Sequence, residues 1–536
     1  MRTYSTDRLI VRGLAALAAW ALASSALAAS YYVATTGSDS AGDGTLDKPF
    51  RTIGVGLNRM ASGDTLIVKP GTYNDLENFI NGRTYRIPSG TASRYTTIAA
   101  EVPFSVRIRN TKQMNYWDSA LRLNVDYVRV DGFIFEINQS QDPEYIADID
   151  GRFNKVTRSI FKRTGATNQY GGWVQITGSD NLLEDCAGVG SARYGFAIGG
   201  PNSTAQRNIL RRCVGRVDYS VSNQPKATFN VYGNNSGNNV RDTLLQNCIA
   251  IDGRKGPNSS ESTYGGFYFP KNATRTTIQG SIVLNVEAEH AGYFVKELGA
   301  QDLKMVNSIA WGGYGTNYIA GIRANSSGQG TYFELDHVTV GGYVNGYYNQ
   351  DSAPSRILRN SLFLNNGART SSSDYGWTAS HNGFFPASQA VGSNGVAVSA
   401  GALKYLVRVE PGTAAAAKGS DGLDIGANVT KRYGRSGTLW GEPGYDQITS
   451  DSLWPWSFED HIKRVFAEPH SPPAGAVPST NDTTRGFAAA TDPFGKPMTL
   501  TRYIWQYLGS EIPAEIYGSG PLAPERLQGL KATILP

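Results

Sequence analysis

The sequence predicts an all-β parallel solenoid, a fold in which short strands from successive coils stack directly on one another. Three observations support this prediction. A short motif returns about every 27 residues over much of the chain. Glycine, with 61 residues, is abundant together with Asn, Ser, Thr and Tyr, which favours turns and strands over helices. A chain of 536 residues is also far longer than one ordinary globular core requires.

The first residues have the features of a secretory leader. Three arginines precede the apolar run LAALAAWALASSALAA, which contains the small-x-small cleavage site Ala26-Leu27-Ala28. The alternative is a membrane anchor, but the run is rich in alanine, and a spanning helix needs about 20 strongly apolar residues. We therefore expect the mature protein to be secreted, periplasmic or held at the surface of a bacterial cell.

The charge balance argues against one class of partner. The formal net charge is +5, from 50 Lys and Arg against 45 Asp and Glu. This value is too weakly basic for a nucleic-acid-binding protein of this size. After the leader, no segment is apolar over a length that spans a bilayer, so we expect no membrane span. The sequence leaves the oligomeric state open.

The repeat places a small residue before apolar residues in each coil. Its spacings are 27, 27, 27, 35, 33, 27, 30 and 23 residues. Chance does not maintain such a period over nine sites, and a unit of this length with Gly and Asn turns is one coil of a parallel solenoid. The nine sites are Gly132, Ser159, Cys186, Cys213, Cys248, Ser281, Ser308, Val338 and Ser361.

The three cysteines belong to this column of small inward residues. A free cysteine behaves as a small apolar residue, so we expect Cys186, Cys213 and Cys248 to lie in the core. Stacked neighbours come close enough to bridge, but adjacent parallel coils rarely provide the torsion angles of a disulfide. We therefore predict three free thiols.

Both ends of a solenoid expose strand edges and core, so we expect caps. Residues 50–60 have apolar positions at helical spacing and are predicted to form an N-terminal cap helix. Beyond residue 400 the repeat fades, and two helices are predicted at 456–466 and 498–509. The predicted division of the chain is a signal peptide at 1–28, a solenoid with its cap at 29–400, and a C-terminal cap or extension at 401–536.

A second motif, Gly-aromatic-x-apolar, predicts a further strand in each coil. Strand residues alternate between faces, which assigns the motif residues to two columns. The predicted inward stack consists of Phe196, Phe229, Phe267, Tyr293, Ile322 and Tyr347. The next positions, predicted to point outward, are Ala197, Asn230, Tyr268, Phe294, Arg323 and Tyr348. Two positions further along, also predicted outward, are Tyr232, Pro270, Lys296, Asn325 and Gln350.

The outward positions form a predicted patch of aromatic rings, amides and cations. Exposed aromatic side chains in a continuous patch indicate a binding surface. Flat rings with hydrogen-bonding neighbours suit a sugar chain. The alternative is that the rings only stabilise the strands by stacking on the next coil. The predicted substrate-binding residues are Asn230, Tyr232, Phe294, Asn325, Tyr348 and Gln350.

Two N-terminal segments resemble those of a known superfamily. YYVATTGSDSAGDGTLDKPFRTI (31–53) and GDTLIVKPGTYND (63–75) look like the first module of many secreted proteins of the right-handed parallel β-helix, pectate-lyase-like superfamily. The resemblance covers roughly residues 31 to 400 and implies a right-handed parallel β-helix of about ten coils. Polysaccharide lyases of the alginate lyase and chondroitinase B kind have this architecture, as do hydrolases, esterases and adhesins.

Those lyases use a lysine base and an arginine on neighbouring coils, and Lys296 and Arg323 lie 27 residues apart. The resemblance implies β-elimination, in which Lys296 or Lys271 takes the proton and Arg323 neutralises the enolate. A nearby cation lowers the pKa of the lysine that acts as base. Tyr268 is the predicted acid for the leaving oxygen. The Asp-Asp pair of polygalacturonases and the WIDH tetrapeptide of one pectate lyase type do not occur in this sequence.

The predicted function is therefore an exported lyase acting on a uronate-containing acidic polysaccharide. One alternative is a non-catalytic protein that binds glycan or self-assembles at the cell surface or in the matrix. Another is a glycoside hydrolase, which needs two carboxylates about 5 to 9.5 Å apart. No metal site is predicted. Calcium binding is left open at Asp39 and Asp43 and at Asp421 and Asp424, although such Asp-Gly turns are more often plain loops.

Overall fold

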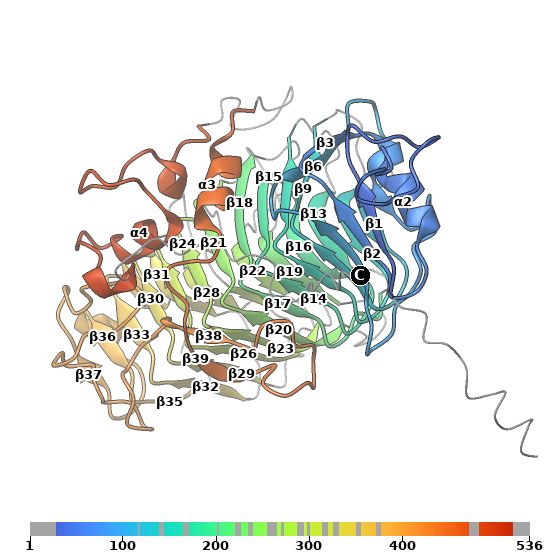
Figure 1. Ribbon diagram of the computed structural model, residues 1–536. Helices are drawn as coiled ribbons and strands as arrows, with labels where there is room; N and C mark the ends of the chain where they lie inside the picture. The colour runs from blue at the N-terminus through green and yellow to red at the C-terminus, as the bar shows by residue number, and fades with distance from the viewer. Residues whose placement is uncertain are drawn as a thin grey trace, which may run out of the picture.

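The protein is a right-handed parallel β-helix, as the sequence predicts (Figure 1). Each complete coil contributes one short strand to each of three parallel sheets, called here sheets A, B and C in chain order within a coil. The computed structural model describes residues 28–115, 118–138, 144–164, 171–200, 203–219, 227–233, 240–254, 265–269, 273–286, 294–296, 301–312, 320–324, 332–349, 355–370, 377–470 and 482–517.

The three sheets run through the described chain from Ser30 to Ala397. Sheet A consists of β1 (Ser30–Val33), β2 (Thr65–Val68), β5 (Thr96–Ala100), β8 (Val128–Asp131), β11 (Lys155–Thr157), β14 (Leu182–Glu184), β17 (Ile209–Arg211), β20 (Arg241–Gln246), β23 (Thr274–Gln279), β26 (Gln301–Val306), β29 (Phe333–Asp336), β32 (Arg356–Arg359) and β35 (Trp377–Ser380). Sheet B consists of β3 (Gly71–Asn74), β6 (Val106–Arg109), β9 (Phe133–Ile137), β12 (Ile160–Arg163), β15 (Ala187–Ser191), β18 (Val214–Tyr219), β21 (Ile249–Ile251), β24 (Ile282–Leu284), β27 (Ile309–Trp311), β30 (Thr339–Gly341), β33 (Leu362–Leu364), β36 (Gly383–Phe385) and β37 (Val396–Ala397). Sheet C consists of β4 (Ile80–Asn81), β7 (Leu121–Leu123), β10 (Tyr145–Ile149), β13 (Gly172–Ile176), β16 (Tyr194–Gly199), β19 (Ala227–Tyr232), β22 (Gly265–Phe269), β25 (Phe294–Lys296), β28 (Ala320–Ala324), β31 (Asn345–Asn349) and β34 (Ala368–Thr370).

The remaining elements lie at the ends and on the outside of the β-helix. Helix α2 covers the first coils and is the N-terminal cap helix that the sequence predicts at residues 50–60 (Figure 1). Among the described residues, no helix has the length and apolar character that crossing a bilayer requires. The elements are α2 (Ile53–Arg59), α3 (Glu459–Ala467), α4 (Leu500–Trp505), the antiparallel pair β38 (Lys431–Tyr433) and β39 (Ile448–Ser452), and the 3-10 turns η1 (Leu76–Asn78), η2 (Ala387–Gln389), η3 (Gly486–Ala488) and η4 (Ala514–Ile516).

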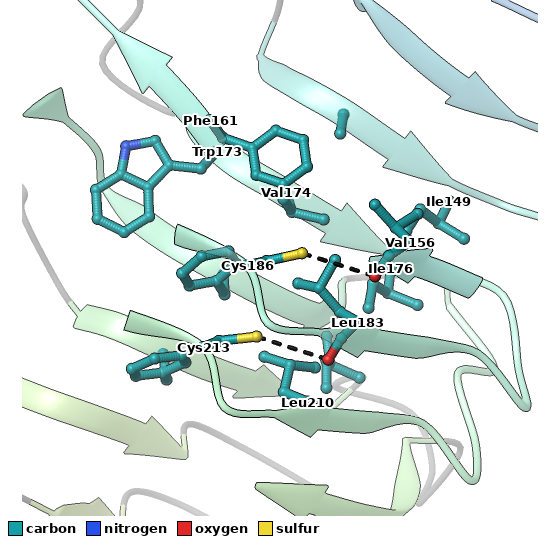
Figure 2. Close-up of a cluster of buried hydrophobic side chains, with 14 of the residues drawn as sticks. Ile149, Val156, Phe161, Trp173, Val174, Ile176, Leu183, Cys186, Leu210 and Cys213 are labelled. Carbon is teal, nitrogen blue, oxygen red and sulfur yellow. Dashed lines mark hydrogen bonds between the residues drawn. The ribbon is translucent and has the colours of Figure 1, made fainter. Parts of the chain in front are cut away.

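The column of small residues follows the turn from sheet A to sheet B. Cys186, Cys213 and Cys248 are fully buried, and all three are free thiols, which confirms both predictions. Figure 2 shows the first two with their thiols directed at backbone oxygens, Cys186 Sγ at 3.6 Å from Val156 O and Cys213 Sγ at 3.6 Å from Leu183 O. A small side chain fits here because the chain turns sharply just before it.

In the predicted column, the position assigned to Gly132 is wrong by one residue. Ile134 pairs with Ile160, so Phe133, not Gly132, lies level with Ser159. Gly132 instead has a φ of 90° and takes the left-handed turn position. Glycine adopts this conformation without the steric cost that a Cβ atom brings. The same turn position is held by Arg158 in the next coil, at a φ of 47°.

A test of the column follows from its mixed Cys and Ser occupancy. We expect Cys213→Ser to lower the free energy of unfolding by no more than about 1 kcal/mol, because the hydroxyl can donate to the same backbone oxygens. Cys213→Leu should lower the free energy of unfolding by about 1–3 kcal/mol, because the larger side chain overpacks the site. Denaturant unfolding followed by fluorescence measures both, and a leucine variant as stable as the parent would contradict the tight packing.

A ladder of asparagines stabilises another turn of each coil, the one that leads from sheet C to sheet A. Asn154, Asn181 and Asn208 are all buried. Asn181 Oδ1 accepts a hydrogen bond of 2.9 Å from the Asn154 amide, and Asn208 Oδ1 accepts one of 2.9 Å from the Asn181 amide. Each side-chain nitrogen donates to a backbone oxygen of the preceding coil. The ladder satisfies buried backbone groups that the turn would leave unpaired.

The C-terminal residues cover the outer face of sheet B. A second apolar cluster joins outward residues of sheet B, such as Val214 and Ile249, to Ile462, Phe466 and Trp505 of α3 and α4. Figure 1 shows these two helices beside β18, β21 and β24. Sheet B is covered on both faces here, and strands such as β15 and β21 are buried along their whole length. The boundary predicted at residue 400 stays a prediction.

Partly buried charges also join the extension to sheet B. Glu468 accepts hydrogen bonds from Arg107 Nη1 at 3.0 Å and from Lys162 Nζ at 2.7 Å. Although burial opposes ionisation, these donors hold the pKa of the Glu468 carboxyl below its ordinary value. Both the apolar cluster and these charged groups therefore hold the extension on the outer face of sheet B.

Candidate functional site

One uninterrupted row of residues runs along the outer face of sheet C. Strand pairing places these residues level with one another from coil to coil, and those whose side chains the structure describes belong to the face opposite the core. Their chemistry changes along the row, from charged groups at the N-terminal end to amide and aromatic groups in the middle. The row consists of Arg122, Asp148, Gln175, Ala197, Asn230, Tyr268, Val295, Arg323 and Tyr348.

A compact charged cluster occupies the N-terminal end of the row. Arg122 Nη1 lies 3.4 Å from Asp148 Oδ2, and Arg122 Nη2 lies 2.7 Å from Asp150 Oδ2. Asp150 Oδ1 also accepts a hydrogen bond of 2.7 Å from Thr177 Oγ1. Ser119 Oγ donates to Asp148 Oδ2. One guanidinium group therefore bridges two carboxylates, and it is bound more tightly to Asp150.

Asp148 is the carboxyl group in this cluster with a strongly altered pKa. Burial raises the pKa of Asp148 to about 7, against the lowering effects of the Ser119 hydrogen bond and the Arg122 charge. The neighbouring charges of Asp150 and Glu144 raise it further. A side chain with such a pKa exchanges protons near neutral pH, which is the property of an acid or base catalyst.

Three tyrosines gather over the middle of the row. The rings of Tyr194 and Tyr268 are stacked with centroids 6.4 Å apart, and the rings of Tyr194 and Tyr232 lie 6.5 Å apart. The Arg193 guanidinium lies over the Tyr194 ring at 5.3 Å from its centroid. Tyr194 and Tyr232 are half-buried, so part of each ring faces outward. Such rings with a cation beside them are suited to the apolar faces of sugars.

Asn230 lies in the same row beside these rings, and only 2% of it is exposed. Its Oδ1 atom has no hydrogen-bond partner among the residues that the structure describes. Leaving a buried acceptor unpaired costs roughly 1–3 kcal/mol. A hydroxyl of a bound ligand is one donor that would satisfy it.

Two of the sequence-predicted residues are placed correctly in the row but are less exposed than predicted. Asn230 and Tyr268 occupy the outward positions that the motif assigns. They are 2% and 4% exposed, so neither is an open surface group. The reason is their neighbours, because Tyr194 packs on Tyr268 and on Ala227 in a small outer cluster. Tyr232, by contrast, remains half-buried as part of the tyrosine group.

The predicted register is wrong by one residue in β25. Phe294 pairs with Phe267 and Ile322, the positions of the inward stack, whereas the prediction assigns Phe294 to the outward row. Val295 is therefore the residue level with Arg323, and Lys296 pairs with Phe269 and Ala324. The sequence GYFV offers two adjacent aromatic residues for one core position, and alternation alone cannot choose between them.

The other predicted residues are described in part or not at all. Arg323 is half-buried at its predicted position, and Tyr348 follows it in the row. For Phe294, Lys296 and Tyr348 the structure describes the strand but not the side chain. Lys271, Tyr293, Asn325 and Gln350, together with Pro270 and the leader at 1–27, lie outside the described residues.

Sequence analysis missed the Arg122, Asp148 and Asp150 cluster. The signal for it is the segment YIADID, in which two aspartates alternate with apolar residues in a strand. That pattern places both carboxylates on one face. The 26-residue offset to LRL, which carries Arg122, would then have brought the arginine level with Asp148.

The turns considered for calcium hold their carboxylates in local hydrogen bonds. Asp39 Oδ1 accepts from the Arg51 and Thr52 amides, and Asp43 Oδ1 accepts from the Thr45 amide and hydroxyl. Asp421 and Asp424 likewise accept backbone donors, from Leu423 and Ala417. Within the described ranges, no group of three or more His, Cys, Asp or Glu side chains is arranged to hold a metal ion.

Comparison with known proteins gives likenesses in structure alone. No protein-family model matches the chain, and no curated protein sequence is significantly similar to it. The chain is similar to pectate lyase Pel9A, with 16% identity, a TM-score of 0.41, and coverage of 74% of this chain and 95% of that one.

Two further likenesses have equally low scores. A PL6 family polysaccharide lyase from Pseudopedobacter saltans has 14% identity and a TM-score of 0.39, over 61% of this chain and 81% of that one. A GH136 lacto-N-biosidase from Eubacterium ramulus has 10% identity and a TM-score of 0.43, over 69% of this chain and 67% of that one. Likenesses of this extent assign no activity. The three all-parallel sheets themselves give the chain its right-handed parallel β-helix fold.

Proposed function

We propose that the protein is an exported polysaccharide lyase that binds a uronate-containing chain along the outer face of sheet C and cleaves it by β-elimination. The observation that carries this proposal is the uninterrupted outward row from Arg122 to Tyr348. It combines guanidinium groups at both ends, which bind carboxylates, with amide and aromatic groups between them. A linear acidic polymer offers both kinds of group, carboxylates and flat sugar faces.

The face has the dimensions of a polymer site and not of a small-molecule pocket. Arg122 and Arg323 are separated by seven strand spacings of about 4.8 Å, or roughly 34 Å. Between them lie Asn230, whose acceptor has no partner within the described part of the chain, and the partly exposed Tyr194 and Tyr232. Several sugar units would contact such a row at once. This arrangement supports a chain that lies across the coils, parallel to the axis of the β-helix.

The direct test is to incubate the purified protein with alginate, pectate and glycosaminoglycans. Elimination creates a double bond conjugated to the uronate carboxyl, so the expected result is a rise in ultraviolet absorbance with at least one of these polymers. A neutral glucan is the control and should give none. Absence of absorbance with every uronate polymer would contradict the proposal, and a non-catalytic glycan-binding protein would then be favoured if the polymers still bind.

A glycoside hydrolase is the second candidate, and the pair of aspartates on either side of Arg122 favours it. Hydrolases use two carboxyl groups, one of which has a raised pKa. The same incubations separate the two reactions, because hydrolysis produces new reducing ends without ultraviolet absorbance.

The predicted catalytic pair is tested by Lys296→Ala and Arg323→Ala. If Arg323 holds a substrate carboxylate, its loss removes a charged hydrogen bond worth about 1.5–3 kcal/mol, and KM should rise about tenfold or more. Arg275→Ala is the matched control, because Arg275 is a half-exposed arginine on sheet A that pairs with Asp242. Unchanged kinetics in both test variants would exclude Lys296 and Arg323 from the site.

A further inference from the structure

We propose that Asp148 is the base that takes the proton from the uronate, and that Arg122 beside it holds the carboxylate of the same sugar. This inference rests on the function proposed above and names the reacting residues of that site. It replaces the predicted lysine base with a carboxylate at the other end of the row.

The geometry of the cluster leaves one side of Arg122 for a substrate. Asp150 anchors Nη2 at 2.7 Å, and Thr177 in turn orients Asp150. Nη1 lies 3.4 Å from Asp148, which is longer than a strong charge-assisted hydrogen bond. An incoming carboxylate that binds at Nη1 would therefore displace little, and it would bring its sugar next to Asp148.

Both reacting groups are shielded but not closed off. The side chain of Arg122 is 19% exposed and that of Asp148 is 14% exposed. Shielding strengthens the attraction between the guanidinium group and a substrate carboxylate. Access remains from the outer face, because Arg122 and Asp148 both occupy outward positions and pair directly across β7 and β10.

The surrounding groups set the protonation of Asp148 near the neutral range. Arg122 of β7 and Ser119, just before β7, face Asp148 from the previous coil. Glu144 and Asp150 flank its own strand, β10. On the next coil β13 places the neutral Gln175 beside it. Burial is the largest effect and raises the pKa of Asp148 to about 7. A base is most effective when its pKa lies close to the working pH.

The proposed reaction balances without a further reactant. Ionised Asp148 accepts the proton on C5 of the uronate, while Arg122 stabilises the negative charge that develops on the carboxyl group. The C5–H electron pair forms the C4–C5 double bond, and the C4–O bond to the preceding sugar breaks. The departing oxygen then takes a proton, which protonated Asp148 can return to it, so that the carboxylate is regenerated.

The register argues against Lys296 in this role. Lys296 pairs with Phe269, a residue of the buried core, and its strand position lies one beyond the outward row. It is also five strand spacings from Asp148, roughly 24 Å, so the two residues cannot share one reacting sugar. Asn230, three strands from Asp148, has a buried acceptor without a partner among the described residues, which independently supports ligand binding on this part of the face.

The test is Asp148→Asn in the full-length protein, assayed on whichever uronate polymer the parent cleaves. Loss of a general base should lower kcat by about 10²–10⁴-fold. The kcat/KM of the parent should rise with pH through about 7, because the base must be ionised, and this limb should be missing from any residual activity of the variant. Asp126→Asn is the matched control: this aspartate lies in the loop after β7, where it accepts a hydrogen bond from the Arg152 amide, and its variant should keep full activity.

Folding of the variant is verified by its melting temperature. The folded pKa of Asp148 lies above the value of about 4 for an unfolded chain, so its ionisation destabilises the fold increasingly between pH 4 and about 7. The neutral amide introduced by the Asp148→Asn substitution avoids this penalty. The difference in melting temperature, variant minus parent, should therefore be larger at pH 8 than at pH 5.

The outcomes separate the two proposals. A parent inactive on every uronate polymer overturns the proposed function and this assignment with it. If the parent is an active lyase and Asp148→Asn keeps the same rate, only the assignment of Asp148 as the base is overturned. The same holds if Lys296→Ala loses all activity while Asp148→Asn does not. A parent whose rate falls with rising pH through about 7 would overturn the base role, because Asp148 would then act as a proton donor.

Discussion

Replacing Asp218 with alanine is expected to lower the free energy of unfolding by about 3–5 kcal/mol. Its fully buried carboxylate lies 2.7 Å from Arg216 Nε and 2.6 Å from Arg485 Nη2. Arg216 is itself fully buried on β18, while Arg485 belongs to the C-terminal extension. Removing the carboxylate leaves two shielded guanidinium groups without their counter-ion, and this is the main cost.

The measurement is denaturant unfolding of the Asp218→Ala variant against the parent, and Asp242→Ala is the matched control. Asp242 also pairs with an arginine of a neighbouring coil, at 2.6 Å from Arg275 Nε, but that arginine is 51% exposed. An exposed pair of this kind contributes about 0–1 kcal/mol. Equal losses in the two variants would mean that the buried carboxylate does not hold the extension to sheet B.

The second large effect is expected for Trp173→Ala, which should lower the free energy of unfolding by about 3–5 kcal/mol. Trp173 is fully buried in the core of the coils around β13, in the cluster of apolar side chains drawn in Figure 2. Its ring packs edge-on against Phe196 with centroids 5.3 Å apart. Gly188 and Gly195 make room for it, since a Cβ atom at either position would come within 2.4 Å of the ring. Neighbours without side chains cannot fill the cavity that the substitution leaves.

Unfolding monitored by circular dichroism measures this loss, and Trp173→Phe should recover a large part of it. Trp440→Ala is the control, because Trp440 is only partly buried against a small outer cluster on sheet A. A Trp173→Ala variant with the stability of the control would show that the coils can close around the missing ring.

The site could be predicted only in part, and its particular residues show why. The Gly-aromatic motif correctly aligned Asn230, Tyr268, Arg323 and Tyr348 in one outward row, because alternation along a strand is a local property. It failed at Phe294, where two adjacent aromatic residues suit the core equally well and the pairing with β22 decides between them. The exposure of Tyr268 also depends on Tyr194, a residue from two coils earlier.

The cluster around Asp148 could not be predicted from the sequence for a different reason. An aspartate in a strand has an ordinary pKa unless it is buried and has charged neighbours. Those neighbours come from β7 and from the segment before it, on the previous coil. The sequence shows the alternating aspartates of ADID, but the raised pKa exists only once the coils are stacked.

The sequence by itself determined the solenoid, the position of its turns, the N-terminal helix and the burial of the three cysteines. These features depend on a repeat and on side-chain alternation, which residues close together in the chain encode. Tertiary structure alone decided that residues beyond 398 cover sheet B, that Asp218 meets Arg485 from 267 residues away, and that Asp148 lies buried beside Arg122. Each of these depends on burial and charge shared between distant segments, and no local pattern records such contacts.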